Sequence, residues 1–463
     1  MNIDSKQKYK KSDHLLIIKG DNEKSLAYHS IFNNPRVLDL SIITFINFFS
    51  TPISVDELKH ICEGEIAEVM DELIKLHFIV PLDENARGLI KKMHVPFLKK
   101  VQHGTSLSRL ELAISDACNL GCTHCMHFKN NEIPSRTGKA LNMSIDIAKT
   151  SIDTFVDVVR KAGNNKVRVH FGNGEPLMNW KMLKYCLEYC SSINDISFSF
   201  AINTNLTLVT KEIAEVLKEY NVKISTSLDG LREGNDLIRV DREGKGTFDT
   251  IIEKFNLLKS INYPIDGFSI TVTSKNFKHI NANILDFAIE MGIKDISMDF
   301  DLVDTTDIPV EQCVAKIIEM RRYAIQHGLN FYGTWETPYR NLMLSSWLNS
   351  PHAFCPAMEG STIAFGVDGS LKVCGHTNSK IGTISQISDI FSPNSEYINL
   401  IKNRLPGNNV TCTGCSIEGA CAGQCHVTLE SSRRNNKLMM TMCEFMRLTT
   451  EQLLKEYISH FEL

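Results

Sequence analysis

Residues 109–125 read RLELAISDACNLGCTHC, and this stretch decides the fold of the largest part of the chain. The run RLELAIS predicts a β-strand over 109–115. Cys118, Cys122 and Cys125 follow it directly. In parallel α/β proteins the chemistry gathers at the carboxyl ends of strands, so we expect a functional site at this end of the strand.

Five further strand-like runs follow, each separated from the next by a helical stretch. The six predicted strands are 109–115, 166–172, 196–203, 222–230, 267–273 and 295–300. Strand then helix, repeated in this way, predicts parallel strands with helical crossovers. A closed eightfold barrel would need two more units. We therefore expect an α/β domain at 108–330 that is a partial barrel of six β/α units or an open sheet.

An N-terminal unit is predicted at 13–95. Its helical patterns are 37–50, a segment capped by Ser54, and 65–78, and a strand-like FIVPL closes it. This order is typical of a winged helix-turn-helix domain, which often binds DNA. The helices are rich in acids, however, so phosphate contacts are disfavoured. These acids are Asp56, Glu57, Glu63, Glu65, Glu68, Asp71 and Glu72.

The rest of the chain divides into a linker at 96–107, a mostly helical bridging region at 331–352, a cysteine-rich region at 353–447 and a C-terminal helix at 448–463. The cysteine-rich region shows little periodic apolar pattern. We therefore expect it to be loop-rich and to need metal for folding.

Composition agrees with a globular protein of about three domains. The chain has 463 residues, 43% hydrophobic and 22% charged, with a net charge of -4. Neither a secretory signal nor an apolar run of about 20 residues is found, so we expect a cytoplasmic protein with no membrane or nucleic-acid partner. In a reducing compartment its fourteen cysteines indicate metal binding or chemistry. Four scattered ones, Cys62, Cys186, Cys190 and Cys313, are predicted to be buried core residues.

The first three cysteines favour an iron–sulfur cluster. Three thiolates within eight residues can hold one cubane, which leaves one of its four irons without a protein ligand. Zinc is the alternative, but a zinc site usually has four ligands. His124 would have to be the fourth, and its place between Cys122 and Cys125 makes that geometry hard.

The spacing C-x3-C-x2-C after the first strand resembles the radical S-adenosylmethionine superfamily. The resemblance implies that Cys118, Cys122 and Cys125 hold a catalytic [4Fe-4S] cluster and that S-adenosylmethionine binds to it, next to His124. Gly172-Asn173-Gly174-Glu175 resembles the segment that holds the methionine amino group, with Asn173 in place of a glycine. Ser227 and Arg239 match a cofactor-contacting serine and the arginine that pairs with the methionine carboxylate.

The seven C-terminal cysteines resemble the SPASM domain, which houses two auxiliary [4Fe-4S] clusters. The resemblance assigns one cluster to Cys412, Cys415, Cys421 and Cys443, and the other to Cys355, Cys374 and Cys425. The second set has only three thiolates, so His352, Cys313 or a substrate group is considered as the fourth ligand. Zinc is again the alternative.

SPASM enzymes mostly modify peptides, and the N-terminal unit is similar to the PqqD-like element that binds leader peptides by strand addition. The resemblance implies a ribosomally synthesised precursor peptide as substrate and a flavodoxin or ferredoxin as electron donor. A thioether or another side-chain crosslink is the first reaction considered. Peptide epimerisation, with Cys313 as the hydrogen donor, is an alternative.

Two other functions are weighed. Sulfatase maturases, which make formylglycine, typically carry an aspartate directly after the second SPASM cysteine, whereas Gly375 follows Cys374 here. The other is a DNA-binding iron–sulfur redox sensor, which would bind duplex DNA in a salt-sensitive way and would not turn over S-adenosylmethionine.

Overall fold

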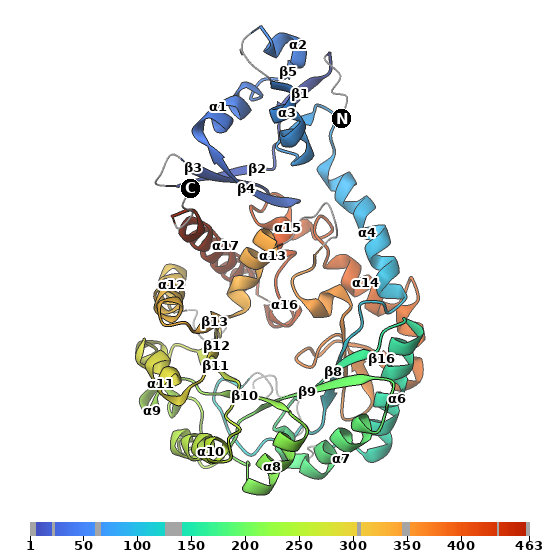
Figure 1. The fold of residues 1–463 in the computed structure, drawn as a ribbon, viewed down its shortest axis with the longest axis vertical. Coiled ribbons are helices and arrows are strands. Elements are labelled where there is room, and N and C mark those ends of the chain that lie inside the picture. The colour runs from blue at the N-terminus through green and yellow to red at the C-terminus, as the bar shows by residue number, and fades with distance from the viewer. Residues whose placement is uncertain are drawn as a thin grey trace.

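The computed structural model describes residues 6–20, 24–60, 66–125, 141–302, 307–344, 352–432 and 435–459. Figure 1 shows three parts along the long axis: an N-terminal unit at one end, a sheet with surrounding helices at the other, and a C-terminal segment between them. Among these residues no helix is long and apolar enough to cross a membrane.

One sheet of ten strands forms the larger end of the molecule. Its order is β13-β12-β11-β10-β9-β8-β7-β14-β15-β16. All six predicted strands are present. The bounds are β7 Arg109–Ala113, β8 Lys166–Gly172, β9 Ser197–Thr204, β10 Lys223–Ser227, β11 Gly267–Val272, β12 Asp295–Phe300, β13 Asn330–Tyr332, β14 Thr362–Phe365, β15 Ser370–Lys372 and β16 Lys380–Thr383.

Two more parallel strands extend the six that were predicted. Strand β13 pairs in parallel with β12, and β14 pairs in parallel with β7. Eight strands are therefore parallel, as in a closed barrel. The sheet nevertheless stays open, because β14 is followed by the antiparallel strands β15 and β16 and does not pair with β13.

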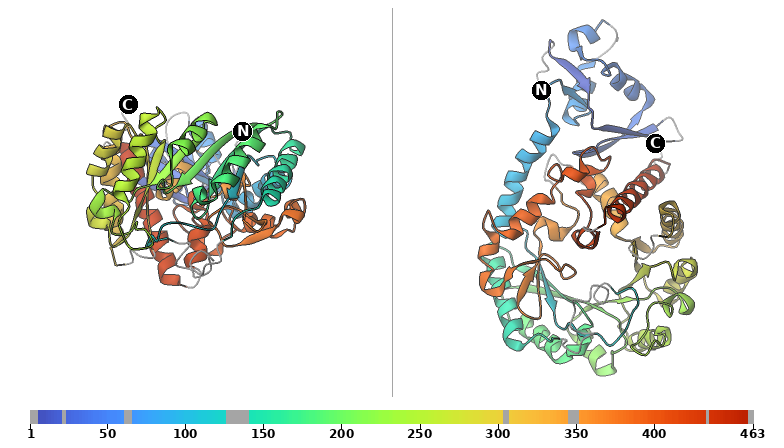
Figure 2. Two further views of the ribbon diagram at one scale, coloured as in Figure 1. Left: turned by 90° about the horizontal axis from the view of Figure 1, so that it is seen from below. Right: turned by 180° about the vertical axis from the view of Figure 1, so that it is seen from behind.

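Helices between the strands cover one face of this sheet, as Figure 2 shows from below. They are α6 Ile145–Lys161, α7 Trp180–Ser191, α8 Lys211–Glu219, α9 Arg232–Asn235, α10 Phe248–Ser260, α11 Asn283–Met291 and α12 Val310–Gln326. Helix α13 Thr337–Leu344 lies instead in the middle of the molecule, against α15, α17 and the N-terminal unit. Side chains along each strand alternate between the two faces of the sheet accordingly. In β8, Val167, Val169 and Phe171 are buried in the helix-facing core, whereas Arg168 and His170 point to the opposite, concave face. Polar side chains therefore line the concave face.

The C-terminal segment shares the main hydrophobic core. Ile363, Phe365, Leu371 and Tyr397 are buried in the same cluster as the strands and helices of the barrel. The first half of this region therefore packs on the core of the large sheet through β14–β16, and its need for metal stays a prediction. Its helices are α14 Glu396–Asn403, α15 Glu418–Cys421, α16 His426–Ser432 and α17 Asn436–Ser459.

The N-terminal unit contains two small antiparallel sheets and three helices. The sheet orders are β5-β1-β6 and β2-β3-β4. Ser54 caps α2 in a capping box with Glu57, as its sequence predicts. The first helix begins at Leu40 rather than 37, because β4 continues to Asp39. The bounds are β1 Lys8–Lys11, β2 Leu15–Lys19, β3 Lys24–His29, β4 Asn33–Asp39, α1 Leu40–Phe48, β5 Ile53–Ser54, α2 Val55–Leu58, α3 Ile66–Lys75 and β6 Ile79–Pro81.

The predicted linker at 96–107 was mostly wrong. Helix α4 spans Ala86–Gln102, with Pro96 inside it. It runs along the side of the molecule from the N-terminal unit to the barrel (Figures 1 and 2). Ile90, Phe97 and Val101 are buried along one side of this helix. The two ends of the molecule are therefore joined by a packed helix.

Candidate functional site

The loop that carries the first three cysteines is held against the segment after α9. The backbone nitrogens of Gly121 and Thr123 donate to the carbonyls of Val240 and Ile238, both at 2.8 Å. Cys122 is buried, and Cys118 and Cys125 are half-buried. The loop thus presents its three thiols at the carboxyl end of β7, where the sequence predicted a site.

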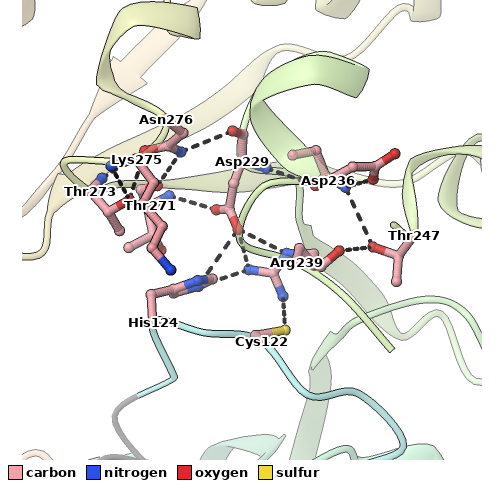
Figure 3. Close-up of polar contacts among 11 residues, drawn as sticks. Cys122, His124, Asp229, Asp236, Arg239, Thr247, Thr271, Thr273, Lys275 and Asn276 are labelled. Atoms are coloured by element: carbon pink, nitrogen blue, oxygen red, sulfur yellow. Dashed lines mark hydrogen bonds and ion pairs between the residues drawn. The ribbon is translucent and has the colours of Figure 1, made fainter. Parts of the chain in front are cut away.

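A buried ion pair lies beside this loop, as Figure 3 shows. Arg239 donates from Nε and Nη2 to Asp229 Oδ2 at 2.9 and 2.8 Å. Its Nη1 points to Cys122 Sγ at 3.6 Å, and its Nη2 lies 3.4 Å from His124 Nε2. Asp229 is itself fixed by the backbone nitrogen of Thr271, at 2.8 Å. Arg239 is therefore a fixed cation next to the thiol trio.

An amide network faces the other side of the trio. Asn205 Nδ2 donates to Asn119 Oδ1 at 2.9 Å and lies 3.8 Å from Cys118 Sγ. Thr207 Oγ1 donates to Asn205 Oδ1 at 2.8 Å. Polar hydrogens thus point at two of the three sulfurs, an arrangement that suits charged thiolates.

Burial favours the neutral form of two of these thiols, because it raises their pKa values. It raises the pKa of Cys118 to about 12. Burial also raises the pKa of Cys122, and the nearby Arg239 opposes that rise. Buried thiols grouped beside an arginine and an amide fit a soft, thiolate-bound group, because metal binding displaces the protons and charges the sulfurs.

The GNGEP segment follows β8 at the same end of the sheet. Gly174 has a φ of 35°, and a Cβ there would lie 2.4 Å from the carbonyl oxygen of Ala117, so the position requires glycine. Glu175 is buried, and its carboxylate accepts from Thr204 Oγ1 and from the nitrogens of Asn205 and Leu177. Asn173 donates to Asp116 Oδ1 at 2.5 Å. The segment is tied directly to the loop after β7.

A cavity of about 310 Å³ opens next to this segment. It lies between the concave ends of β7 and β8 and the stretch from β14 to β16. Gly172 and Asn173 line one side, and His376, two residues after Cys374, lines another. Burial, followed by the charge on Arg109, lowers the pKa of the lining residue His170 to about 4.

Glu111 connects the two sides of this cavity. It is buried on β7, and its Oε2 accepts from the nitrogen of Gly375 at 2.5 Å. Its Oε1 lies 2.8 Å from Arg109 Nε. The loop after Cys374 is therefore held at the concave face of the sheet, close to the GNGEP segment.

The seven C-terminal cysteines fall into two groups. Burial, then the charges of Cys412, Cys415 and Cys443, raise the pKa of Cys421, so these four lie close enough to interact. In the same way, Cys425 and Cys355 both raise the pKa of Cys374, after burial and Glu111. These interactions run within the two proposed ligand sets, and the assignment of each set to one cluster stays a prediction.

Arg404 lies among these cysteines. Its guanidinium is buried and donates from Nη2 to the carbonyl of Gly423 at 2.8 Å, whereas its Nε has no hydrogen-bond partner in the described part of the chain. Burial lowers its pKa, and the charges of Cys421 and Cys425 raise it. A buried cation with an open donor fits a negatively charged cluster in this place.

The remaining candidates are placed as follows. Ser227 ends β10 on the concave side, half-buried. His352 pairs with Glu359 at 3.1 Å. Cys186, Cys190 and Cys313 are buried in the main core, as predicted, and Cys62 lies outside the described residues. Among described residues, no group of three or more His, Cys, Asp or Glu side chains is arranged to hold a single metal ion.

Three residues of this site were missed from the sequence. Asp229 lies two residues after Ser227, and only the serine was singled out from the sequence. Asn205 follows β9 at the same edge of the sheet, and strand-end position was its only signal. Arg404 carried no signal, because nothing in the local sequence pattern shows that its side chain is buried beside the cysteines.

Comparisons with known proteins agree with this geometry. Residues 112–288 match the family model of the radical SAM superfamily. The radical SAM cyclopropyl synthase TigE of Paramaledivibacter caminithermalis is 24% identical over 462 residues, which cover 96% of this chain and 95% of TigE. The cysteine-type anaerobic sulfatase-maturating enzyme of Clostridium novyi is 30% identical over 183 residues, 38% of this chain and 46% of that enzyme.

A solved structure shares the fold. Native anSMEcpe with bound AdoMet and Cp18Cys peptide has a TM-score of 0.60 and 17% identity, and the match covers 77% of this chain and 99% of that one. The chain described here therefore contains a radical SAM domain and is an enzyme, related to TigE and to sulfatase-maturating enzymes. The radical SAM superfamily uses S-adenosylmethionine and a [4Fe-4S] cluster.

Proposed function

We propose that this enzyme removes two hydrogens from a ribosomally synthesised precursor peptide and forms a new bond in their place. Cys118, Cys122 and Cys125 would hold the cluster to which S-adenosylmethionine binds. When bound, the pair supplies a 5′-deoxyadenosyl radical, which takes hydrogen from a C–H bond. The chain's own share is to position the reactants and to exclude water.

The cofactor contacts follow from the loop geometry. The backbone of Gly172, Asn173 and Gly174 would meet the methionine amino group, while Glu175 locks that backbone through its three hydrogen bonds. Arg239 would pair with the methionine carboxylate while Asp229 holds its guanidinium in place. His124 and Ser227 complete the proposed set.

The cavity of about 310 Å³ is the observation that carries the proposal. It joins the GNGEP segment to the loop after Cys374, so a substrate group there would lie between the proposed S-adenosylmethionine and the proposed cluster of Cys355, Cys374 and Cys425. With the cluster of Cys412, Cys415, Cys421 and Cys443, the enzyme would hold three [4Fe-4S] clusters.

The N-terminal unit supports a peptide substrate. One face of the sheet β2-β3-β4 packs on α1 and α3, and the other face packs on α13 and α17. Both faces being covered, an extended leader peptide can join this sheet only along an outer strand, β2 or β4, each of which pairs on one side only. Docking there would raise the effective concentration of the core peptide at the barrel.

Two kinds of new bond fit the proposal. Ring closure within one side chain is supported by the similarity to a cyclopropyl synthase along almost the whole chain. A thioether crosslink is supported by the group of only three thiols around Cys374, which would leave a cluster position for a substrate sulfur. Each reaction removes two hydrogens: the 5′-deoxyadenosyl radical would take one as an atom, and the other would leave as a proton while one electron passes to a proposed auxiliary cluster.

The test is co-expression with the short open reading frames beside this gene, followed by mass spectrometry of the peptides. The proposal expects a loss of two hydrogens for each event, and only when the leader is present. Thiol alkylation then separates the two bonds, since a thioether consumes a cysteine thiol and a carbon ring does not. An unchanged mass with an inverted residue would indicate epimerisation instead, and absence of 5′-deoxyadenosine under dithionite would refute the proposal.

A further inference from the structure

A basic surface lies along α4, α14 and the segment that follows α14. Residues 86–110 and 397–417 contain no Asp or Glu, although the whole chain carries a net charge of -4. The lysines of this surface are exposed, and none of them forms an ion pair within the described residues. We call it the α4 surface; its lysines are Lys91, Lys92, Lys99, Lys100 and Lys402.

Direct packing makes the two acid-free segments one surface. Ile90 Cγ2 on α4 lies 2.8 Å from the place that a Cβ on Gly407 would occupy. Asn408 Nδ2 lies 3.4 Å from His94 Nδ1 and donates to the carbonyl of Lys402 at 2.8 Å. Lys91 and Lys402 both lower the pKa of His94, after burial, so the two lysines flank this contact.

The surface leads directly to cysteines of the fully ligated cluster proposed above. Val410 is 85% exposed, and it begins the short helical turn that ends at Cys412. Thr411, Thr413 and Gly414 around it are exposed as well. Nearby Glu418 is buried and is neutralised by Arg87 at 2.7 Å, so this carboxylate does not offset the lysines.

We propose that the α4 surface docks an acidic one-electron carrier protein of the flavodoxin or ferredoxin class, with Val410 as its apolar centre. Such encounters are brief, bury little area and are steered by opposite charge. A basic surface that leads to an exposed apolar residue next to a proposed redox centre meets these needs. The inference rests on the proposed function, because it places the electron route at the cluster of Cys412, Cys415, Cys421 and Cys443.

Charge reversal tests the docking with the holoenzyme. Calorimetry would measure binding of a flavodoxin, and separately of a ferredoxin, to wild type, to the double variant K91E/K402E and to a control, K211E/K259E. The control lysines are exposed on α8 and α10, away from α4. We expect K91E/K402E to weaken binding about tenfold at low salt and the control to match wild type. The carrier that binds identifies the class.

Equal affinity in K91E/K402E and wild type would overturn the inference. So would tight binding of a duplex oligonucleotide that the same variant abolishes, since the surface would then serve nucleic acid. Circular dichroism and iron content check that each variant is folded and loaded. Reduction by dithionite bypasses the carrier, so 5′-deoxyadenosine formed equally by all three proteins keeps the proposed function intact even if docking fails.

Discussion

At the residue scale, Asp229 organises the proposed cofactor end of the sheet. Its carboxylate binds Arg239 and the backbone of β11, while its own backbone binds Asn235 and Asn276. These contacts join the end of β10 to the segment that holds the cysteine loop. One buried carboxylate thus fixes both the cation beside Cys122 and the loop around it.

Asp229→Asn should therefore act on stability and on chemistry. The variant leaves the buried guanidinium of Arg239 without a counter-charge, which we expect to cost about 3 kcal/mol in the free energy of unfolding. Denaturant unfolding measures this loss, and the rate of 5′-deoxyadenosine formation should fall as well. Asp249→Asn is the matched control, because Asp249 pairs with Arg232 in solvent. Equal effects of the two variants would contradict the prediction.

His170 gives a residue-scale prediction in pH. Burial first, and Arg109 second, lower its pKa to about 4 from the usual 6.5. The unfolded chain then binds more protons than the folded one between these values, so the contribution of neutral His170 is complete above pH 6.5 and is lost as the pH falls toward 4.

We expect His170→Gln to flatten the fall in melting temperature over this acidic window. The exposed His103 provides the control as His103→Gln. Both variants should keep part of the wild-type dependence of melting temperature on pH, because His29 and His94 are buried too. Burial is the main cause that lowers their pKa values to about 2 and about 4. If the melting temperature of His170→Gln falls with pH as steeply as that of wild type, burial does not set the protonation of His170.

At the scale of elements, a short turn joins the N-terminal unit to the C-terminal cysteines. The nitrogen of Gly419 on α15 donates to the carbonyl of Ser30 at 2.7 Å. A Cβ at Gly419 would lie 2.1 Å from the carbonyl oxygen of Ile31. This contact leaves no room for a side chain, and Cys421 follows two residues later.

We expect Gly419→Ala to separate α15 from the turn between β3 and β4. Because the clash is with backbone, it can be relieved only by moving the turn between β3 and β4, at a cost of about 1–3 kcal/mol. We expect faster proteolysis between the N-terminal unit and α4, together with loss of iron from the proposed cluster of Cys412 and its partners. Gly88→Ala on α4 serves as the control, since a Cβ there meets only the side chain of Asn85, at 3.1 Å. Normal iron content in Gly419→Ala would disprove the coupling.

Elements with local signals were predictable from the sequence, and elements defined by distant partners were not. The six β/α strands and the cap at Ser54 follow from local pattern. Strands β13 and β14 have only three and four residues, and each is recognisable only by the long-range neighbour it pairs with. Helix α4 was missed because its second half was assigned to a linker at 96–107, although burial of one side of the helix stabilises it.

At the scale of the whole molecule, the cysteine clusters and the cavity share one arrangement. The three cysteines after β7 belong to the barrel. The seven cysteines from Cys355 to Cys443 belong to the C-terminal segment (Figure 1). The division of these cysteines into clusters stays a prediction from the sequence. The sequence did not predict that Glu111 would hold the Cys374 loop against the sheet, because that contact joins residues 264 positions apart.

This arrangement predicts that the cluster of Cys118, Cys122 and Cys125 can be removed separately from the cluster of Cys412 and its partners. Wild type purified without oxygen should contain about twelve irons, four for each of three cubanes. C118A/C122A/C125A should keep about eight irons and form no 5′-deoxyadenosine with dithionite. C412A/C415A should also keep about eight, yet still cleave S-adenosylmethionine under dithionite because the trio is intact. Iron analysis and chromatography of the nucleoside measure both outcomes. A wild-type protein that is colourless and carries zinc would refute the cluster assignment, and unchanged nucleoside formation after loss of the trio would refute the proposed site of radical formation.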